Sequence, residues 1–179
     1  MVSVPFDRGE LTFDLPPGWQ GMVVESKTVP PIEDVPAAVA EAVAEPTNSP
    51  PLRELARPGD RVCIVFTDVT RASPDHLLVP PVLAELEAAG VRDEDVTLLC
   101  GIGLHRPSTP EEKVAKLGQA VVDRYLDDDS QPMNPDALVD LGTTESVIPL
   151  TESNIANEAD LLIATGNVEP HQYAANSGG

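Results

Sequence analysis

The sequence predicts an α/β fold, in which a parallel, Rossmann-like sheet with flanking helices is preceded by an N-terminal β-hairpin. Three apolar runs, at 61–66, 95–100 and 159–165, have the composition of strands that are buried on both faces, as in a parallel sheet. Helical patterns lie between these runs. The resulting strand–helix–strand–helix–strand order implies right-handed crossovers in one doubly wound sheet. The chain of 179 residues suits one domain of ordinary size.

The first part of the chain predicts a hairpin followed by short helices. Apolar and polar residues alternate through 2–24, and the turn is supplied by Asp7-Arg8-Gly9. A third short strand is expected at 22–24, and helical segments are expected at 35–43 and 51–56. We expect an N-terminal segment and an α/β core, at 1–60 and 61–179.

Helix boundaries in the core carry clear signals. A helix is expected over 74–89, with Gly90 as its C-terminal cap. Another begins at Thr109, which can act as the N-cap, with Pro110 in the first turn and Glu112 at capping-box spacing. Residues 127–140 are acidic and rich in turn formers, and the other expected elements are a short strand at 146–149 and a helical turn at 154–158.

Charge and apolar patterning limit the classes of function. The chain has 11 Lys and Arg against 30 Asp and Glu, and its net charge of -19 argues against nucleic acid or an anionic membrane as a partner. No apolar run approaches the roughly 20 residues of a membrane span, and the first residues lack a signal-peptide pattern. Cys63 and Cys100 lie in apolar runs, which predicts buried thiols, no disulfide and a cytoplasmic protein.

A polar loop follows each of the three apolar runs, at 67–71, 101–106 and 166–171. In an open α/β sheet, ligands bind outside the carboxyl ends of the strands. We therefore expect the three loops to converge on one site.

Each polar residue in these loops also has a plain structural interpretation. Asp68 can cap a turn or helix, and Arg71 can be a surface ion-pair partner instead of a bidentate ligand for a carboxylate or phosphate. His105 and His171 can be structural or can lie in a cleft. His76, near the start of a predicted helix, is expected to be structural.

Several familiar sites are disfavoured by the motifs. Gly101-x-Gly103 is not a dinucleotide fingerprint, no Walker sequence occurs, the cysteines lack zinc-site spacing, and no G-x-S-x-G accompanies a histidine. Two histidines and an arginine at one cleft fit a different chemistry. Imidazole exchanges protons near neutrality, and two imidazoles on opposite sides of a stereocentre are what a racemase or epimerase needs. The arginine would orient a substrate carboxylate.

Taken together, the motifs resemble the N-terminal domain of the lactate racemase family, the nickel-pincer-nucleotide-dependent 2-hydroxyacid racemases and epimerases. The resemblance covers 68–179 and is carried by Asp68-Val69-Thr70-Arg71, by 103–109, and by 168–174 with Ser177-Gly178-Gly179. It implies a two-domain isomerase with its active site between the domains. Hydride would move from the substrate Cα to a modified pyridinium nucleotide that holds nickel, and then return to either face.

The resemblance also implies a role for each motif residue. His105 and His171 would be the paired acid/base groups for the hydroxyl proton. The substrate, a small 2-hydroxyacid, would be bound by Arg71, Asp68 and Arg106. The cofactor would be lined by Thr70, Gly166, Glu169, Ser177, Gly178 and Gly179.

The last motif departs from the family pattern, in which the loop reads close to A-G-F/Y-S-G-G before a lysine that tethers the cofactor. Here the loop reads Ala174-Ala175-Asn176-Ser177-Gly178-Gly179 and the sequence stops. We therefore expect the tether lysine, the nickel-ligating histidine and a C-terminal domain to lie beyond this chain. Two alternatives stay open: the same chemistry on a bulkier, dicarboxylic or sugar-acid substrate, and a non-catalytic module that binds the cofactor or a carboxylate.

Overall fold

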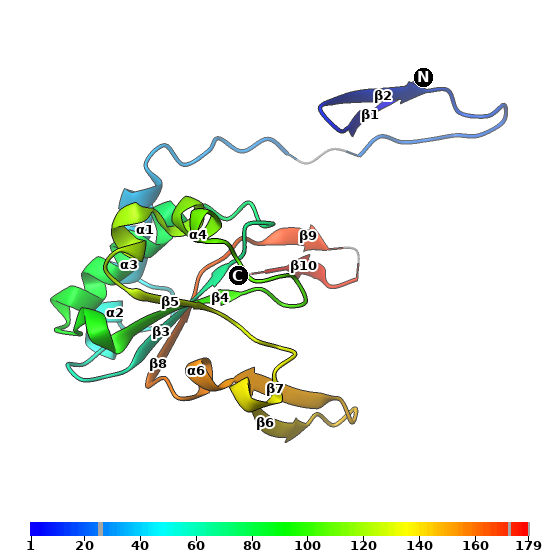
Figure 1. Cartoon of the computed structure of the whole chain (residues 1–179). Coiled ribbons are helices and arrows are strands. Elements are labelled where there is room, and N and C mark those ends of the chain that lie inside the picture. Colours follow the sequence, from blue (N-terminus) through cyan, green and yellow to red (C-terminus); the bar gives the residue numbers. More distant parts are fainter. Residues whose placement is uncertain (25–26, 172, 179) are drawn as a thin grey trace. The chain divides into compact units, whose positions relative to one another are not determined.

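A computed structural model describes residues 1–24, 27–171 and 173–178 (Figure 1). The chain divides into two compact units, Met1–Ile32 and Glu33–Gly179, and each is described by itself. In the first unit, β1 (Val2–Phe6) and β2 (Gly9–Phe13) form the antiparallel hairpin that the alternation predicts. The strand expected at 22–24 does not form, because these residues have no strand to pair with in the described chain.

The larger unit is built on one parallel sheet with the strand order β5-β4-β3-β8 (Figure 1). This sheet, with its flanking helices, confirms the predicted fold class. The parallel register places the carboxyl ends of all the strands at one edge. The strands are β3 (Val62–Thr67), β4 (Val96–Gly101), β5 (Leu126–Asp129) and β8 (Leu161–Ala164).

Five helices contribute side chains to the main core on one face of this sheet. Because strand side chains alternate, Ile64 and Phe66 of β3 point into this core, together with Leu98 of β4 and Leu86 of α3, and all four are nearly inaccessible to solvent. The helices are α1 (Val35–Ala44), α2 (Leu52–Leu55), α3 (Asp75–Ala88), α4 (Pro110–Leu117) and α5 (Gln119–Val122). Helices α1 and α2 pack against α3, so they lie in the same compact unit as the sheet. The expected division of the chain into 1–60 and 61–179 stays a prediction.

The opposite face is more thinly covered. The small apolar cluster on this face consists of Cys63 and Leu99 from the sheet and Ala156 from α6 (Asn154–Asn157). The chain between β5 and α6 forms the antiparallel hairpin of β6 (Leu138–Thr143) and β7 (Pro149–Ser153), not a crossover helix. The strand expected at 146–149 is therefore misplaced, because Val147 has φ +60° and belongs to the turn of this hairpin. Short 3-10 turns precede β4 and β6, at Asp93–Asp95 and Pro135–Ala137.

Two strands of the parallel sheet, β5 and β8, also differ from the sequence expectation. β5 has the sequence Leu-Asp-Asp-Asp and no apolar run, and it is compatible with the sheet because Asp127 pairs with Lys113 at 2.5 Å and Asp129 accepts from Ser108 at 2.8 Å. β8 was expected to be buried on both faces. It lies at the edge of the sheet, and the Leu162 side chain is 48% exposed.

In the part of the chain that the structure describes, no helix is both long and apolar enough to cross a membrane. Cys63 and Cys100 are buried and free, as predicted, and burial raises the pKa of each thiol to about 11.

Helix α4 begins with the predicted capping box. The Thr109 hydroxyl accepts from the Glu112 amide at 3.3 Å, and the Glu112 carboxylate accepts from the Thr109 amide at 2.9 Å. Thr109→Ala should lower the free energy of unfolding by about 1 kcal/mol, because it leaves an amide of the first turn without an acceptor. Urea denaturation measures this change.

Thr47→Ala is the matched control, since Thr47 lies in an exposed turn outside any helix. It should change stability by less than about 0.5 kcal/mol. Equal losses in the two variants would contradict the capping role of Thr109.

Candidate active site

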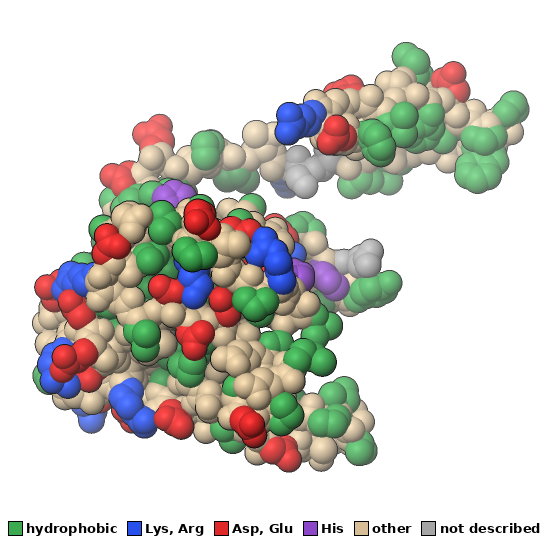
Figure 2. Space-filling model, viewed as in Figure 1, with side chains coloured by type: hydrophobic (Ala, Val, Ile, Leu, Met, Phe, Trp, Pro, Cys, Tyr) green, Lys and Arg blue, Asp and Glu red, His purple; other side chains and the backbone are tan. Residues whose placement is uncertain are grey.

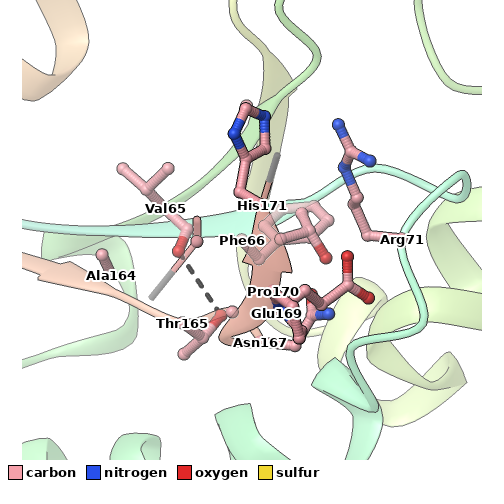
Figure 3. A pocket seen from close by; sticks show the side chains of 13 residues that line it. Val65, Phe66, Arg71, Ala164, Thr165, Asn167, Glu169, Pro170 and His171 are labelled. Carbon is pink, nitrogen blue, oxygen red and sulfur yellow. Dashed lines mark hydrogen bonds between the residues drawn. The ribbon is translucent and has the colours of Figure 1, made fainter. Parts of the chain in front are cut away.

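Two adjoining cavities open at the carboxyl edge of the sheet. The larger, of about 480 Å³, is lined by the ends of β3 and β8 and by the following chain, including His171 of β9 (Glu169–His171) (Figure 3). The smaller, of about 250 Å³, is lined by the loops after β3 and β4, including His105. Thr67, Arg71 and Gly101 line both cavities. The structure thus brings the three polar loops together.

Arg71 is the cation that these cavities share. Among the described residues of Glu33–Gly179, every Lys and Arg except Arg57 and Arg71 lies within 4.0 Å of an acidic side chain. On the face drawn in Figure 2, Lys and Arg side chains lie among those of Asp and Glu. In Figure 3 the Arg71 and His171 side chains extend toward the same side of the larger cavity. An exposed guanidinium without a carboxylate partner is suited to bind an anionic ligand.

Asp68 holds His105 in one orientation. The buried Asp68 carboxylate accepts hydrogen bonds from the Thr70 amide at 3.1 Å, the Thr70 hydroxyl at 2.6 Å and His105 Nδ1 at 2.5 Å. Because an ionised carboxylate only accepts hydrogen bonds, Nδ1 carries the ring proton of His105. In the neutral ring, the Nε2 atom of His105 therefore presents a lone pair.

The same contacts keep Asp68 ionised. Burial opposes the charge, but the hydrogen bonds from Thr70 and His105 outweigh it and hold the pKa of Asp68 below its ordinary value.

His171 is held in the opposite way. It ends β9, which pairs with β10 (Ala175–Ser177), and its Nδ1 accepts from the amides of Tyr173 and Ala174, both at 3.2 Å. A ring nitrogen that accepts amide hydrogens carries no proton, so the proton of a neutral His171 lies on Nε2. In their neutral forms the two histidines therefore differ at Nε2: His105 has a lone pair there, and His171 has an N–H group.

The larger cavity contains three of the six residues expected to line the cofactor. Gly166, Glu169 and Gly178 line it directly, whereas Thr70 binds Asp68 beside the smaller cavity. Gly178 has φ +90°, and a Cβ there would collide with the carbonyl oxygen of Asn167. Ser177 belongs to β10, and Gly179 lies outside the described residues.

Arg106 does not join Arg71. Its guanidinium makes a two-pronged contact with Glu112, at 2.8 and 2.5 Å, beside a third small cavity behind His105. The hydrogen bond from Arg106 and the amide of Thr109 lower the pKa of Glu112 to about 2. This contact therefore persists across the neutral pH range.

Two buried residues at the site were missed by sequence reasoning. Asp75 is 0% exposed, Lys116 is 7% exposed, and they form an ion pair of 2.7 Å beneath the cavities. The signal in the sequence is weak, because an acidic residue at a helix start is ordinary and Lys116 resembles a surface residue of α4. The expected structural role of His76 stays a prediction; its side chain is exposed on α3.

A parallel sheet with polar loops converging at its carboxyl edge places the chain in the class of open α/β domains, whose ligand sites lie at that edge. The family model described as lactate racemase N-terminal domain matches residues 6–179. The chain therefore belongs to the lactate racemase N-terminal domain family.

Individual relatives agree with this assignment. The chain is 31% identical to a lactate racemase of Thermoanaerobacterium thermosaccharolyticum over 99% of its length, and 34% identical to a lactate racemase of Lactiplantibacillus plantarum over 79%. It spans only 42% and 33% of these relatives. The apoprotein structure of the former superposes with a TM-score of 0.83 at 29% identity, over 98% of this chain and 41% of that one. A Thermotoga maritima protein, at 22% identity and a TM-score of 0.60 over 80% of this chain and 35% of that one, shares the fold.

The Asp68 network predicts a dependence of stability on pH. Since the folded-state pKa of Asp68 lies below the unfolded value of about 3.9, ionised Asp68 stabilises the fold above that pH. The contribution is lost as the pH falls through that value toward the lower folded-state pKa. Asp68→Asn should therefore reduce the loss of stability between pH 5 and pH 3, measured from urea midpoints at each pH.

Asp136→Asn is the control, because Asp136 is exposed in a short turn. Its stability profile should run parallel to that of the wild type. A parallel profile for Asp68→Asn as well would show that the network adds no pH-dependent stability.

Proposed function

We propose that this chain is the N-terminal part of an isomerase that racemises or epimerises a 2-hydroxyacid of the lactate type. The observation that carries the proposal is the position of Arg71, unpaired in an acidic chain, on the wall shared by a cavity with His105 and a cavity with His171. The family membership supports the same reaction class. The relatives are longer than this chain, so the rest of the protein would complete the site.

Arg71 would bind the substrate carboxylate. A guanidinium offers two parallel N–H donors that match the two carboxylate oxygens, so it fixes the orientation of the acid as well as its place. The other cation in the sequence motifs, Arg106, is engaged by Glu112. We therefore assign the primary anion contact to Arg71 and leave Arg106 a secondary role in the local potential.

The histidines would handle the proton of the substrate hydroxyl. The lone pair on Nε2 of His105 can accept this proton, and Asp68 would stabilise the imidazolium that forms. The Nε2–H of a neutral His171 can donate a hydrogen bond to the substrate oxygen when that oxygen lies on the other side of the carbon. Inverting the stereocentre would require the hydride to return to the opposite face of the carbon, with a histidine on each side to serve the hydroxyl oxygen.

The larger cavity fits the organic part of a nucleotide cofactor. Its volume of about 480 Å³ is within the range of cofactor sites, and Gly166 and Gly178 keep part of its wall free of side chains. We propose that these glycines, with Thr70, Glu169, Ser177 and Gly179, hold a nickel-pincer nucleotide. When bound, this cofactor would supply a group that takes a hydride from the substrate Cα and returns it.

The described residues contain no group of three His, Cys, Asp or Glu side chains that could hold a metal ion. We expect the nickel ligand and the tether lysine in the remainder of the protein. We also expect a cytoplasmic location, which suits the two free thiols.

Arg71→Lys in the full-length protein should reduce kcat/KM for lactate by about 10- to 100-fold, because an ammonium group does not reproduce the two-pronged grip. Chiral chromatography of lactate measures the rate. Arg57→Lys is the matched control, since Arg57 is also exposed and without an acidic partner but lies away from both cavities. If both variants kept wild-type kinetics, Arg71 would be a surface group.

His105→Ala and His171→Ala should each reduce racemisation in both directions by about 10²- to 10⁴-fold, the usual contribution of a positioned acid or base. Neither residue lies in the core, so both variants should stay folded. The urea midpoint of His171→Ala should stay close to the wild type, and that of His105→Ala should be somewhat lower because Asp68 loses a hydrogen bond. His76→Ala is the control for loss of an imidazole on the surface. Near-wild-type turnover in either site variant would remove that histidine from the mechanism.

A further inference from the structure

A buried ion pair lies beneath the two cavities. Asp75 Oδ2 and Lys116 Nζ are 2.7 Å apart, and both side chains are shielded from solvent. Asp75 is the first residue of α3, and Lys116 lies in the last turn of α4. The pair therefore joins two helices at the point where the site begins.

Hydrogen bonds connect this pair to two strand ends that line the larger cavity. The Thr67 hydroxyl, at the end of β3, donates to Asp75 at 2.9 Å and accepts from Lys116 at 2.9 Å. The Thr165 hydroxyl, directly after β8, donates to the other Asp75 oxygen at 2.9 Å. Since Thr67 and Thr165 line that cavity, the ion pair sets the separation of two of its walls.

The ammonium group of Lys116 also holds the loop that carries Arg71. It donates to the Ser73 carbonyl at 2.8 Å and the Arg71 carbonyl at 3.3 Å, and the Ser73 hydroxyl donates to Asp75 at 3.1 Å. The Arg71 side chain itself has no ion-pair partner among the described residues. The position of the Arg71 side chain therefore depends on the backbone of the loop. The Lys116 ammonium group is the charged group that hydrogen-bonds to this backbone.

Stability alone does not account for the pair. Removing two charges from water is costly, and replacing a buried ion pair by neutral residues of similar size is often neutral or stabilising. What neutral residues do not reproduce is one group whose three N–H donors reach two backbone carbonyls and a strand hydroxyl while its charge faces a carboxylate.

We propose that Asp75 and Lys116 are positioning residues, which fix the Arg71 loop against the ends of β3 and β8 and so place the substrate carboxylate. The assignment to substrate binding rests on the function proposed for Arg71. The positioning of the loop itself is independent of that function.

The test uses the full-length protein with the double substitution Asp75→Asn/Lys116→Met, which removes both charges and avoids leaving one of them buried alone. We expect amide hydrogen exchange in 68–73 to become about tenfold faster, while the urea midpoint stays close to the wild type. If the protein racemises lactate, KM should rise by about tenfold and kcat should fall less.

Lys113→Met/Asp127→Asn is the matched control. It removes another partly buried Lys–Asp pair from the same helix, one that contacts β5 and not the Arg71 loop. Exchange in 68–73 and KM should both stay at wild-type values in this variant.

The outcomes separate the two proposals. Wild-type protein without racemase activity would overturn the proposed function, and the exchange comparison would still decide the positioning role. Unchanged exchange in the Asp75/Lys116 variant, or an equal change in the control, would overturn the positioning role. Faster exchange with an unchanged KM would overturn its link to substrate binding.

Discussion

The contact between Asp75 and Lys116 is the constraint on which the remaining geometry of the site depends. Each buried charge needs a full set of partners, because an unpaired charge in a low-dielectric interior is costly. Those partners come from the end of β3, from the loop that follows β3 and from the residue directly after β8, so satisfying the charges fixes these segments relative to one another. In the described residues, no buried side-chain nitrogen or oxygen lacks a partner. A buried polar network whose groups all have partners favours a single arrangement. The cavity walls that belong to this network are therefore held in place by it.

Charge is used differently at the surface of the site. The chain has a net charge of -19, so an anionic ligand approaches against an unfavourable field. Most cations of the larger unit are occupied by neighbouring carboxylates, and Lys116 is buried beneath the cavities. Arg71 is left as the exposed positive group where the two cavities meet. On the proposed function, selectivity for an anion would come from the unpaired cation where the two cavities meet, and not from a basic patch.

The parts of the structure that follow from local sequence were predictable. The capping box at Thr109 and the apolar strands β3 and β4 are encoded within a few neighbouring residues, and the motif loops follow from where those strands end. β5 was missed because its aspartates are compensated by Lys113 and Ser108, which lie elsewhere in the chain. The pairing of Asp75 with Lys116 was missed for the same reason. Local patterns show where a charged residue stands but not which distant residue satisfies it.

The two histidines also differ in how firmly their roles are set. His105 Nδ1 is bound to a carboxylate, so gaining a proton at Nε2 leaves its support in place. His171 Nδ1 accepts two backbone amides. On the proposed function, the reverse reaction requires His171 to present a lone pair at Nε2, which moves its proton to Nδ1 and gives up both amide contacts. His105 can therefore gain and lose a proton without losing its hydrogen bond to Asp68. His171 cannot act as a base in the reverse reaction unless its contacts to the amides of Tyr173 and Ala174 are broken. Ala175, which pairs with His171 at the start of β10, has φ +62°, a conformation that glycine adopts with less strain, so the backbone opposite His171 is already held in a costly geometry.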